Sequence, residues 1–419
     1  MDLKLEFLNK TENRTTGCSA QCIFGKIILL IASIILLLGL LVWIFQEKLL
    51  FFPNINGKRD LASNFPGYRH PNENKMNSED VVLTTDDNVK LYCWFIIHKK
   101  FDRYSHEQSS AMHISSNLSE PHHLEQVKKD SPRKKILDKI RKAPKYMKFH
   151  FPEFSDRYEQ QEKAPTIVFF HGNAGNIGHR LPRFLEFYNL IGVNIFAVSY
   201  RGYGDSEGTP SEEGFYLDAK ASLEYVLSRT DVVDKNMIFL YGHSIGGAVA
   251  IDLASKYDVT GVILENTFTN IKSVAFRVYP IFKYFGFFFK FIQRLKFDSV
   301  SKISRVKSPI LFVVGNEDEI IPPTHSVELY MKAGSPKSLN KIYLVSGGSH
   351  NDTWIKGGME FYLMLLQFIY NAIDYNKLEL EVSSNNLINK NQEETLFSIQ
   401  EILKTKESSP ISKLRKKTN

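Results

Sequence analysis

The chain of 419 residues has room for about two or three domains, and 43% of its residues are hydrophobic, which is enough for a sizeable core. Its formal net charge of +7 is modest for this length and lies mainly in two basic tracts, so the composition does not indicate a nucleic-acid-binding fold. Only three cysteines occur, which excludes a disulfide framework and a cysteine zinc site.

An uncharged apolar run extends from Ile27 to Phe45. It is long enough to cross a bilayer as a helix, which needs about 20 residues. It is too long for the core of a signal peptide, and no small-residue cleavage site follows it. We therefore predict an uncleaved transmembrane signal-anchor helix at residues 27–45, preceded by an N-terminal segment at residues 1–26.

The orientation of this anchor is not decided by charge, because lysines and arginines lie on both sides of it. With the N-terminus in the cytosol, Asn117 in Asn-Leu-Ser becomes a glycosylation acceptor on the far side of the membrane. Sequons at Asn9 and Asn13 lie on the other side, so sequons leave both orientations open. We expect a single-pass protein of type II in the endomembrane system or the plasma membrane.

After the anchor, residues 80–85 and 89–97 alternate as a β-hairpin does, with a polar turn between them. Residues 98–164 are polar, and residues 128–148 are strongly basic. We predict a disordered surface insertion at residues 98–164. A contact of its basic residues with anionic lipid beside the anchor is the alternative.

From Thr166 onward, apolar strands alternate with amphipathic helical patterns. The predicted strands are Thr166–Phe170, Val193–Ser199, Met237–Tyr241, Gly261–Leu264, Ile310–Val314 and Lys341–Val345. The predicted helices are His179–Leu190, Ser211–Leu227, Ile245–Tyr257, Thr324–Lys332 and Gly357–Ile373. Repeated βα units imply an α/β fold with a mostly parallel sheet and helices on both faces, with the hairpin as antiparallel strands at one edge.

Residues 268–297 interrupt this alternation and are dense in aromatic residues. Inserted after the sixth strand, they would cover the carboxyl ends of the strands, where open α/β sheets bind ligands. The segment is either an apolar acyl-binding cap or membrane-facing lid, or a cap whose rings merely pack onto the core. Both interpretations remain open at this point.

From residue 376 the chain becomes polar, and it ends in a basic cluster. We predict a flexible tail at residues 376–419. A retrieval signal is an alternative to an ordinary basic end.

The sequence Gly242-His243-Ser244-Ile245-Gly246-Gly247 lies between a predicted strand and a predicted helix. This is the G-x-S-x-G pattern of a nucleophile elbow. Gly242 and Gly246 leave room where the strand and the helix almost collide, and the turn exposes the serine hydroxyl. Ser244 is the candidate nucleophile.

A serine hydroxyl needs a base at neutral pH, and that base is usually a histidine oriented by a buried carboxylate. In this architecture the chain order is serine, acid, histidine. Asp318 follows the penultimate strand and His350 follows the last one, so both fit the order. No convincing set of metal ligands occurs, and we expect no metal or organic cofactor.

An oxyanion requires two N–H donors. One is the backbone amide of Ile245, directly after the nucleophile, and our choice for the other is the amide of Asn173 in the glycine-rich loop after strand Thr166–Phe170. Phosphate binding is the alternative for this loop, but it lacks the Lys-Ser/Thr ending of a P-loop. The glycine-rich turn at residues 200–208 is predicted to support the floor of the site without a catalytic role.

Several strings together resemble the Bem46 family of α/β-hydrolases. They are the segments at residues 171–180, 200–204, 242–247, 265–268, 321–323 and 350–354. The resemblance covers roughly Leu49 to Tyr375, and it implies an α/β-hydrolase domain at residues 49–375 behind a single-pass signal anchor. It also implies a charge-relay system at Ser244, Asp318 and His350. The basic insertion and the long tail depart from the family.

These observations predict a membrane-anchored serine hydrolase that cleaves an acyl ester or thioester of a lipid-like small molecule through an acyl-enzyme. A peptidase or a protein depalmitoylase on the same fold is one alternative. A non-catalytic membrane scaffold that recruits protein partners is another, although the complete set of three residues argues against it. No nucleic-acid partner is expected.

Overall fold

The computed structural model describes residues 20–55, 59–98, 162–283, 286 and 291–407. The insertion predicted at residues 98–164 lies outside the described residues except at its two ends, and so does the sequon at Asn117. The predictions for these residues stay predictions.

Eight strands form one sheet in the order β1-β2-β4-β3-β5-β6-β7-β8. Their bounds are β1 (Ser78–Thr84), β2 (Lys90–Ile96), β3 (Thr166–Phe170), β4 (Asn194–Val198), β5 (Ile238–His243), β6 (Gly261–Glu265), β7 (Ile310–Gly315) and β8 (Lys341–Val345). The pairs β1–β2 and β2–β4 are antiparallel, and all other neighbours are parallel. The predicted parallel sheet with an antiparallel hairpin at one edge is confirmed.

Helices cover both faces of this sheet. Their bounds are α6 (Leu181–Glu186), α7 (Glu212–Ser228), α8 (Ile245–Ala254), α9 (Ile271–Val278), α11 (Ser299–Lys302), α12 (Thr324–Lys332), α13 (Thr353–Lys356) and α14 (Gly358–Glu407). Val168 and Phe170 of β3 pack in one cluster with α7, α8 and α12, whereas Ile167 and Phe169 pack in the other with α6 and α14. The two faces of one strand thus belong to two cores, as expected for a strand buried on both sides.

One predicted helix is divided in the structure. Residues 179–190 were expected to form a single helix, but a 3₁₀ turn (η3, Ile177–Arg180) precedes α6 and a π-helical turn (η4, Phe187–Ile191) follows it. Gly192 ends the segment at a φ of 75°. Pro182 at the start of α6 lacks the N–H that a longer regular helix would need there, which explains the break.

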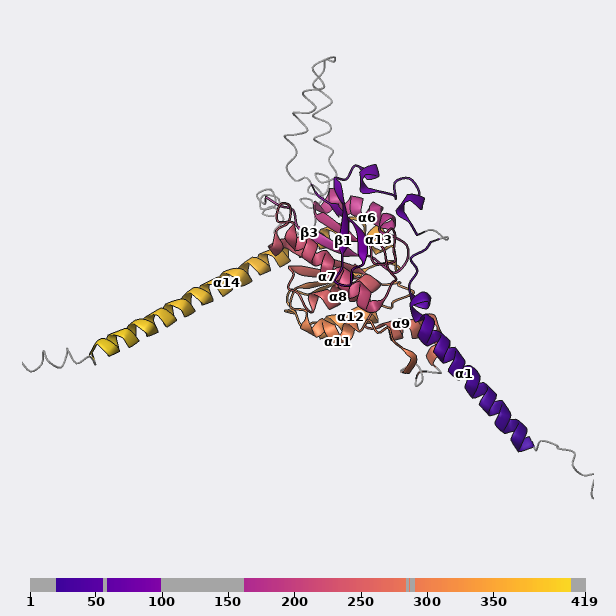
Figure 1. Cartoon of the computed structure of the whole chain (residues 1–419). Helices are drawn as coiled ribbons and strands as arrows, with labels where there is room; N and C mark the ends of the chain where they lie inside the picture. Colours follow the sequence, from indigo (N-terminus) through magenta and orange to yellow (C-terminus); the bar gives the residue numbers. More distant parts are fainter. Residues whose placement is uncertain (1–19, 56–58, 99–161, 284–285, 287–290, 408–419) are drawn as a thin grey trace, which may run out of the picture.

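The tail predicted at residues 376–419 is helical over most of its length, because α14 continues to Glu407, and its flexibility stays a prediction. Residues 358–373 pack against the sheet, and the helix then leaves the domain (Figure 1). The tail was predicted from its polarity, but residues 359–409 contain neither glycine nor proline, and Pro410 follows soon after the helix ends. A run without helix breakers lets a packed helix propagate outward.

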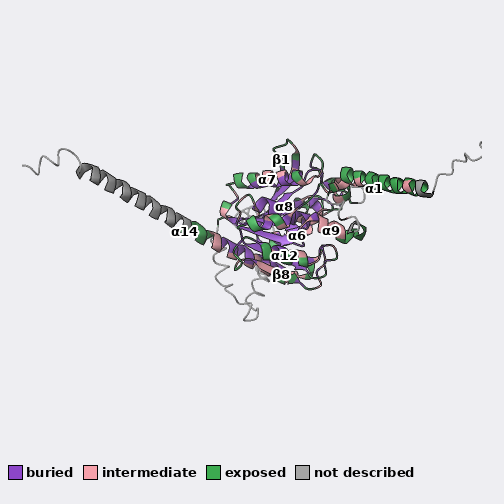
Figure 2. Cartoon of the chain, turned by 90° about the horizontal axis from the view of Figure 1, so that it is seen from below, coloured by how far each residue is buried: buried purple, intermediate pink, exposed green. Residues whose placement is uncertain are grey.

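The predicted anchor at residues 27–45 is also longer in the structure. Helix α1 extends from Ala20 to Leu50, and Ile23–Leu50 is long and apolar enough to cross a membrane. Glu47 and Lys48 follow the uncharged run, and the helix continues through them to Leu50. Figure 2 shows α1 exposed along its length, whereas the sheet and α8 are buried.

Candidate active site

Ser244 lies in the sharp turn between β5 and α8. Its φ of 55° is in the left-handed region, which is strained for a residue with a side chain. The glycines permit this turn: a Cβ at Gly242 would lie 2.4 Å from the oxygen of Gly246, and a Cβ at Gly246 would lie 2.1 Å from the oxygen of Phe170. The local geometry is that of a nucleophile elbow.

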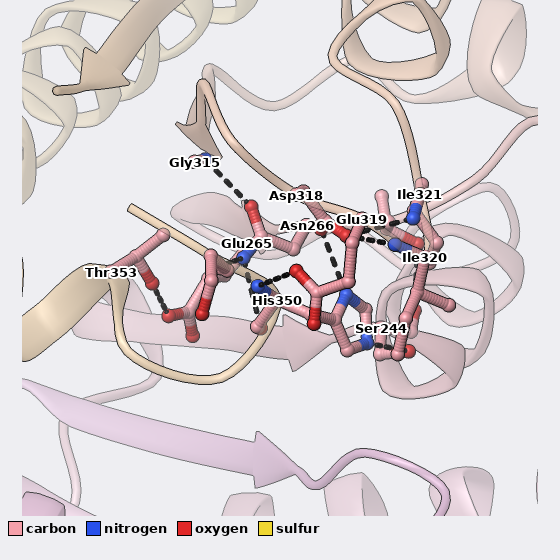
Figure 3. A network of polar contacts seen from close by, with 12 residues as sticks. Ser244, Glu265, Asn266, Gly315, Asp318, Glu319, Ile320, Ile321, His350 and Thr353 are labelled. Carbon is pink, nitrogen blue, oxygen red and sulfur yellow. Dashed lines mark hydrogen bonds and ion pairs between the residues drawn. The ribbon is translucent and has the colours of Figure 1, made fainter. Parts of the chain in front are cut away.

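The side chains of Ser244, His350 and Asp318 form a hydrogen-bonded chain (Figure 3). The Ser244 hydroxyl lies 3.0 Å from Nε2 of His350, and Nδ1 of His350 lies 2.8 Å from Oδ2 of Asp318. The other carboxylate oxygen of Asp318 accepts the backbone N–H groups of Ile320 and Ile321 at 2.9 and 2.7 Å. All three side chains are buried, so the carboxylate is held in one orientation toward the imidazole.

A second set of contacts fixes the loop that carries His350. The backbone oxygen of His350 accepts hydrogen bonds from Nε2 of His243 at 2.9 Å and from Nδ2 of Asn266 at 3.0 Å. The Asn266 Oδ1 in turn accepts the N–H of Gly315 at 2.8 Å. Burial lowers the pKa of His243 to about 3, so this histidine is neutral and donates from Nε2. It therefore orients His350 without competing for its proton.

A buried ion pair supports the nucleophile from below. The backbone oxygen of Glu265 accepts the N–H of Ser244 at 2.9 Å, and the Glu265 carboxylate pairs with Arg183. Tyr241 and Thr353 also donate hydroxyl hydrogen bonds to this carboxylate. Burial opposes ionisation, but the Arg183 cation and the other polar contacts, including the Thr353 and Tyr241 hydroxyls, together outweigh it and lower the pKa of Glu265 to about 2.

Sequence reasoning gave no role to Glu265, Asn266 or His243. The sequence did carry a signal, because Glu265 and Asn266 are polar residues at the carboxyl end of the apolar strand β6. That end lies at the same edge of the sheet as Ser244. What could not be predicted is the partner of Glu265, since Arg183 lies 82 residues earlier in the chain.

The two predicted oxyanion donors lie beside the nucleophile. Ile245 is the first residue of α8, so its N–H has no acceptor within the helix. Asn173 belongs to the loop after β3, and a Cβ built on the neighbouring Gly172 would lie only 3.6 Å from Cβ of Ser244. The loop and the elbow are thus in close contact, which a shared oxyanion site requires.

The glycine-rich turn at residues 200–208 holds this loop in place, as its predicted supporting role implies. The Tyr203 hydroxyl donates to Oδ1 of Asn173 at 2.9 Å, and the Tyr200 hydroxyl donates to the oxygen of His171 at 3.2 Å. Both tyrosines are fully buried. The Asn173 side chain is thereby held, and its Nδ2 donates to the backbone oxygen of Leu50 at the end of α1.

Ser244 and His350 open into a cavity of about 540 Å³. Its walls are largely apolar and come from α1, from α9 in the predicted cap and from the loop after β7. Ile271, Val274 and Val278 of α9 line it, whereas Phe297 at the end of the cap packs onto the core beside Phe215. The described part of the cap therefore both lines the cavity and packs on the domain. Several of its aromatic residues lie outside the described part.

Within the described residues, no group of three or more histidine, cysteine, aspartate or glutamate side chains is placed to hold a metal ion. The chemistry available at the site is that of the serine, its imidazole and the backbone amides.

Comparisons with known proteins identify relatives of this chain. A family model described as serine aminopeptidase, S33, matches residues 161–304. The α/β-hydrolase domain-containing protein WAV2 of Arabidopsis thaliana is 32% identical over 356 residues, which cover 83% of this chain and 92% of that protein. Protein bem46 of Schizosaccharomyces pombe is 42% identical over 203 residues, which cover 48% of this chain and 66% of that protein.

A membrane protein of Saccharomyces cerevisiae, YNL320W, is 39% identical over 48% of this chain and 69% of its own length. Among solved structures, the Pyrococcus furiosus esterase Pf2001 matches with a TM-score of 0.51 and 17% identity, covering 77% of this chain and 97% of the esterase. At this identity the match is evidence for the fold alone.

Proposed function

Because this chain belongs to the Bem46-like family of α/β-hydrolases, we propose that it is a membrane-anchored serine hydrolase cleaving an acyl ester or thioester of a lipid-like substrate. The observation that carries the proposal is the hydrogen-bonded chain from Ser244 through His350 to Asp318 on the floor of an apolar cavity. Membership of the family supports hydrolase activity in general. The serine mechanism and the substrate class are what we propose here.

In the acylation step, the Ser244 oxygen bonds to the acyl carbon while its proton moves to Nε2 of His350. The N–H groups of Ile245 and Asn173 stabilise the resulting oxyanion. Collapse breaks the bond to the leaving alcohol or thiol, which takes the proton from Nε2. Asp318 orients the imidazole and stabilises its cation throughout.

In the deacylation step, His350 takes a proton from water as the water oxygen bonds to the acyl carbon. The ester bond to Ser244 then breaks, the serine recovers its proton from Nε2, and the carboxylic acid leaves. Each step balances with water as the one added reactant, so the residues present are sufficient for the cycle.

The cavity supports a lipid-like acyl group. A volume of about 540 Å³ with aliphatic walls suits a long hydrocarbon chain better than a small polar acyl group. None of its described lining residues is acidic, although an aminopeptidase needs a carboxylate for the substrate's amino group. This disfavours the peptidase alternative and leaves a protein depalmitoylase as a thioesterase version of the same chemistry.

The proposed anchor is α1, in a type II arrangement with the hydrolase domain outside the cytosol. An apolar helix of this length and exposure and a relative described as a membrane protein support the anchor, and they leave its orientation to experiment. Expression in cells followed by endoglycosidase treatment tests it. A mobility shift that disappears in Asn117→Gln supports type II, and an unshifted band in a protein that labels normally contradicts it.

The serine mechanism is tested by labelling the full chain with a fluorophosphonate probe, beside Ser244→Ala. Labelling of the wild type that is lost in Ser244→Ala and greatly slowed in His350→Ala is expected. If the folded wild type does not label, the proposal fails and the non-catalytic scaffold becomes the better reading. Cleavage of an acylated peptide but not of a free lipid ester would instead favour the depalmitoylase.

A further inference from the structure

The last turns of α1 form one wall of the active-site cavity. Val42, Gln46, Leu49 and Leu50 of α1 line it together with the α9 residues described above. Figures 1 and 2 both place α9 directly beside the end of α1 that joins the domain. The helix proposed as an anchor is therefore also a structural part of the substrate site.

Gln46 joins α1 to the return segment of the cap. Its Oε1 accepts the backbone N–H groups of Arg294 and Leu295 at 2.8 and 2.9 Å, and its Nε2 donates to the oxygen of Ile292 at 3.0 Å. One side-chain amide thus forms hydrogen bonds with three backbone groups of the cap, within residues 292–295. A polar residue this far along an apolar helix has a structural reason, which is to fix the cap against the anchor.

Three further contacts follow the same face of the helix. Glu47 forms an ion pair with Arg294, whose guanidinium lies 4.9 Å from the ring centre of Trp43. A Cβ on Gly39 would lie 3.6 Å from Ile292, so the backbone of α1 approaches the cap closely there. The contact between α1 and the cap extends over about two turns and is not an incidental touch.

The length of α1 sets the level of this wall relative to a bilayer. The candidate span Ile23–Leu50 has 28 residues, about eight more than a hydrocarbon core of typical thickness requires. When the uncharged run Ile27–Phe45 fills that core, the core ends near Phe45, and the turn up to Leu50 projects about 8 Å beyond it. The wall then begins just inside the edge of the hydrocarbon and ends at Leu50, next to Asn173.

The outer face of the cap is apolar at the same place. Val278, Ile281 and Phe291 are 48%, 59% and 69% exposed, and α9 lies beside α1, whose own apolar residues are exposed (Figures 1 and 2). Such a patch beside an apolar helix suits contact with lipid better than contact with water. With α1 in a membrane, an opening of the cavity between α1 and the cap would face the surface of the bilayer.

We propose that the acyl chain of the substrate enters from the bilayer and lies along α1, in a corridor between Val42 and Leu49 on one side and α9 on the other. This inference rests on the proposed function and adds the site that the acyl chain occupies. It makes Val42 and Leu49 determinants of acyl-chain preference, although both belong to the anchor.

The test uses the full chain in lipid nanodiscs with p-nitrophenyl butyrate and p-nitrophenyl laurate. Val42→Trp blocks the distal end of the corridor, so kcat/KM for laurate should fall at least roughly tenfold more than kcat/KM for butyrate. Ile44→Trp is the matched control, because Ile44 lies two residues on, faces away from the cavity and is 45% exposed. Its preference between the two esters should equal that of the wild type.

A preference unchanged in Val42→Trp, or altered equally in Ile44→Trp, would overturn the corridor while leaving the serine mechanism intact. Absence of both fluorophosphonate labelling and ester cleavage in the wild type would overturn the proposed function and the corridor together. The two failures are therefore distinguishable.

A different observation concerns the other end of the cavity. Arg180 is the one permanently charged side chain among the described residues that line it. Its Nη2 donates to the oxygen of Ala174 at 2.8 Å, but its buried Nε has no hydrogen-bond partner, and no described carboxylate lies within ion-pair distance. Arg183, one turn further on, has the Glu265 carboxylate as its ion-pair partner.

This arrangement leaves a cation at the site without its own anion. Burial and the charge of Arg183 lower the pKa of Arg180 to about 10, which still leaves it protonated at neutral pH. An unpaired cation and an unsatisfied donor in a largely apolar cavity are costly unless a ligand supplies the missing acceptor. The fork geometry of the guanidinium suits a phosphate or a carboxylate.

We infer that Arg180 binds an anionic group of the substrate, a phosphate or a carboxylate, while the acyl group is presented to Ser244. The substrate class becomes an acyl ester or thioester that carries a negative charge outside its acyl chain. This inference also rests on the proposed function, because it concerns the same site.

Protection of Ser244 from fluorophosphonate labelling tests it without requiring turnover. The competitors are oleoyl glycerol, its phosphate ester and its hemisuccinate, so that neutral, phosphate and carboxylate forms share one acyl chain. An anionic form should protect the wild type at roughly tenfold lower concentration than the neutral form, since a charged hydrogen-bonded pair is gained. In Arg180→Gln this ratio should fall to about one, with Arg180→Lys between them.

Which anionic competitor protects better separates phosphate from carboxylate recognition. Equal protection by all three lipids in the wild type, or an anion preference that persists in Arg180→Gln, would sink the assignment. A wild type that does not label at all would point instead to failure of the proposed function.

Discussion

The side-chain amide of Asn173 donates a hydrogen bond to the backbone oxygen of Leu50, which ties the candidate oxyanion loop to the last residue of α1. Two residues on, the N–H of Gly175 donates to the oxygen of Phe52 at 3.1 Å. The chain leaving the proposed anchor therefore pairs with the loop beside the nucleophile. Anything that displaces α1 displaces the amide proposed to stabilise the oxyanion.

Replacing Asn173 with alanine tests this coupling, because it removes the bonds to Leu50 and Tyr203 while keeping the backbone amide. We expect fluorophosphonate labelling of Ser244 to slow roughly tenfold, as a poorly positioned oxyanion donor loses part of its effect. The free energy of unfolding should fall by about 1–3 kcal/mol for two lost hydrogen bonds. Asn376→Ala, which loses one bond to the oxygen of Asn236 far from the site, is the control. Equal labelling rates for Asn173→Ala and the wild type would contradict the coupling.

The ion pair between Arg183 and Glu265 leads to a prediction about stability. Glu265→Gln leaves the buried Arg183 cation without its anion, which typically costs about 3–5 kcal/mol of folding free energy. Chemical denaturation of the purified chain measures this loss. The double variant Arg183→Met with Glu265→Gln removes both charges and should recover part of it. A Glu265→Gln chain as stable as the wild type would mean that the pair contributes little to the floor of the site.

Buried histidines predict a dependence of stability on pH. Burial lowers the pKa of His171 and His243 to about 3, against about 6.5 in an unfolded chain. Between these values the unfolded chain binds the additional protons, so stability is complete above about pH 6.5 and is lost as the pH falls toward 3. Each such histidine contributes a slope of up to about 1.4 kcal/mol per pH unit.

Thermal unfolding between pH 6.5 and 5.5 measures this slope while Glu265 is still largely ionised in the unfolded chain. His243→Gln should reduce the slope of stability against pH by the contribution of one proton, because the titrating imidazole is gone. The hydrogen bond to His350 should be kept, because a glutamine Nε2 can still donate to its oxygen. His70→Gln, at a partly exposed histidine, is the control. The same slope in His243→Gln and the wild type would show that His243 is not kept neutral by burial.

The order Ser244, Asp318, His350 was predictable because each residue lies in the turn or loop after a strand of a parallel sheet, and the carboxyl ends of such strands meet at one edge. The supporting residues were not predictable in the same way. Arg183 and Glu265 are distant in the chain, and nothing local to either residue names its partner. Long-range packing also decides that Val42 and Leu49 line the site, because their apolar character alone is equally explained by contact with lipid.

At Gly246, helix propensity and tertiary packing predict opposite effects of Gly246→Ala on stability. This glycine is the second residue of α8, where helix propensity alone favours alanine by about 1 kcal/mol. The new Cβ would however lie 2.1 Å from the oxygen of Phe170, a backbone atom at the start of the oxyanion loop that cannot simply rotate away. We expect the clash to prevail, with at least about 1–3 kcal/mol of lost stability and labelling of Ser244 slowed more than tenfold. Gly25→Ala is the matched control, because a Cβ there meets nothing within 4 Å; it should leave labelling unchanged and raise stability by up to about 1 kcal/mol, as helix propensity alone predicts. Faster or unchanged labelling in Gly246→Ala would show that the elbow can open, and that the close approach of α8 to β3 does not set the geometry of the nucleophile.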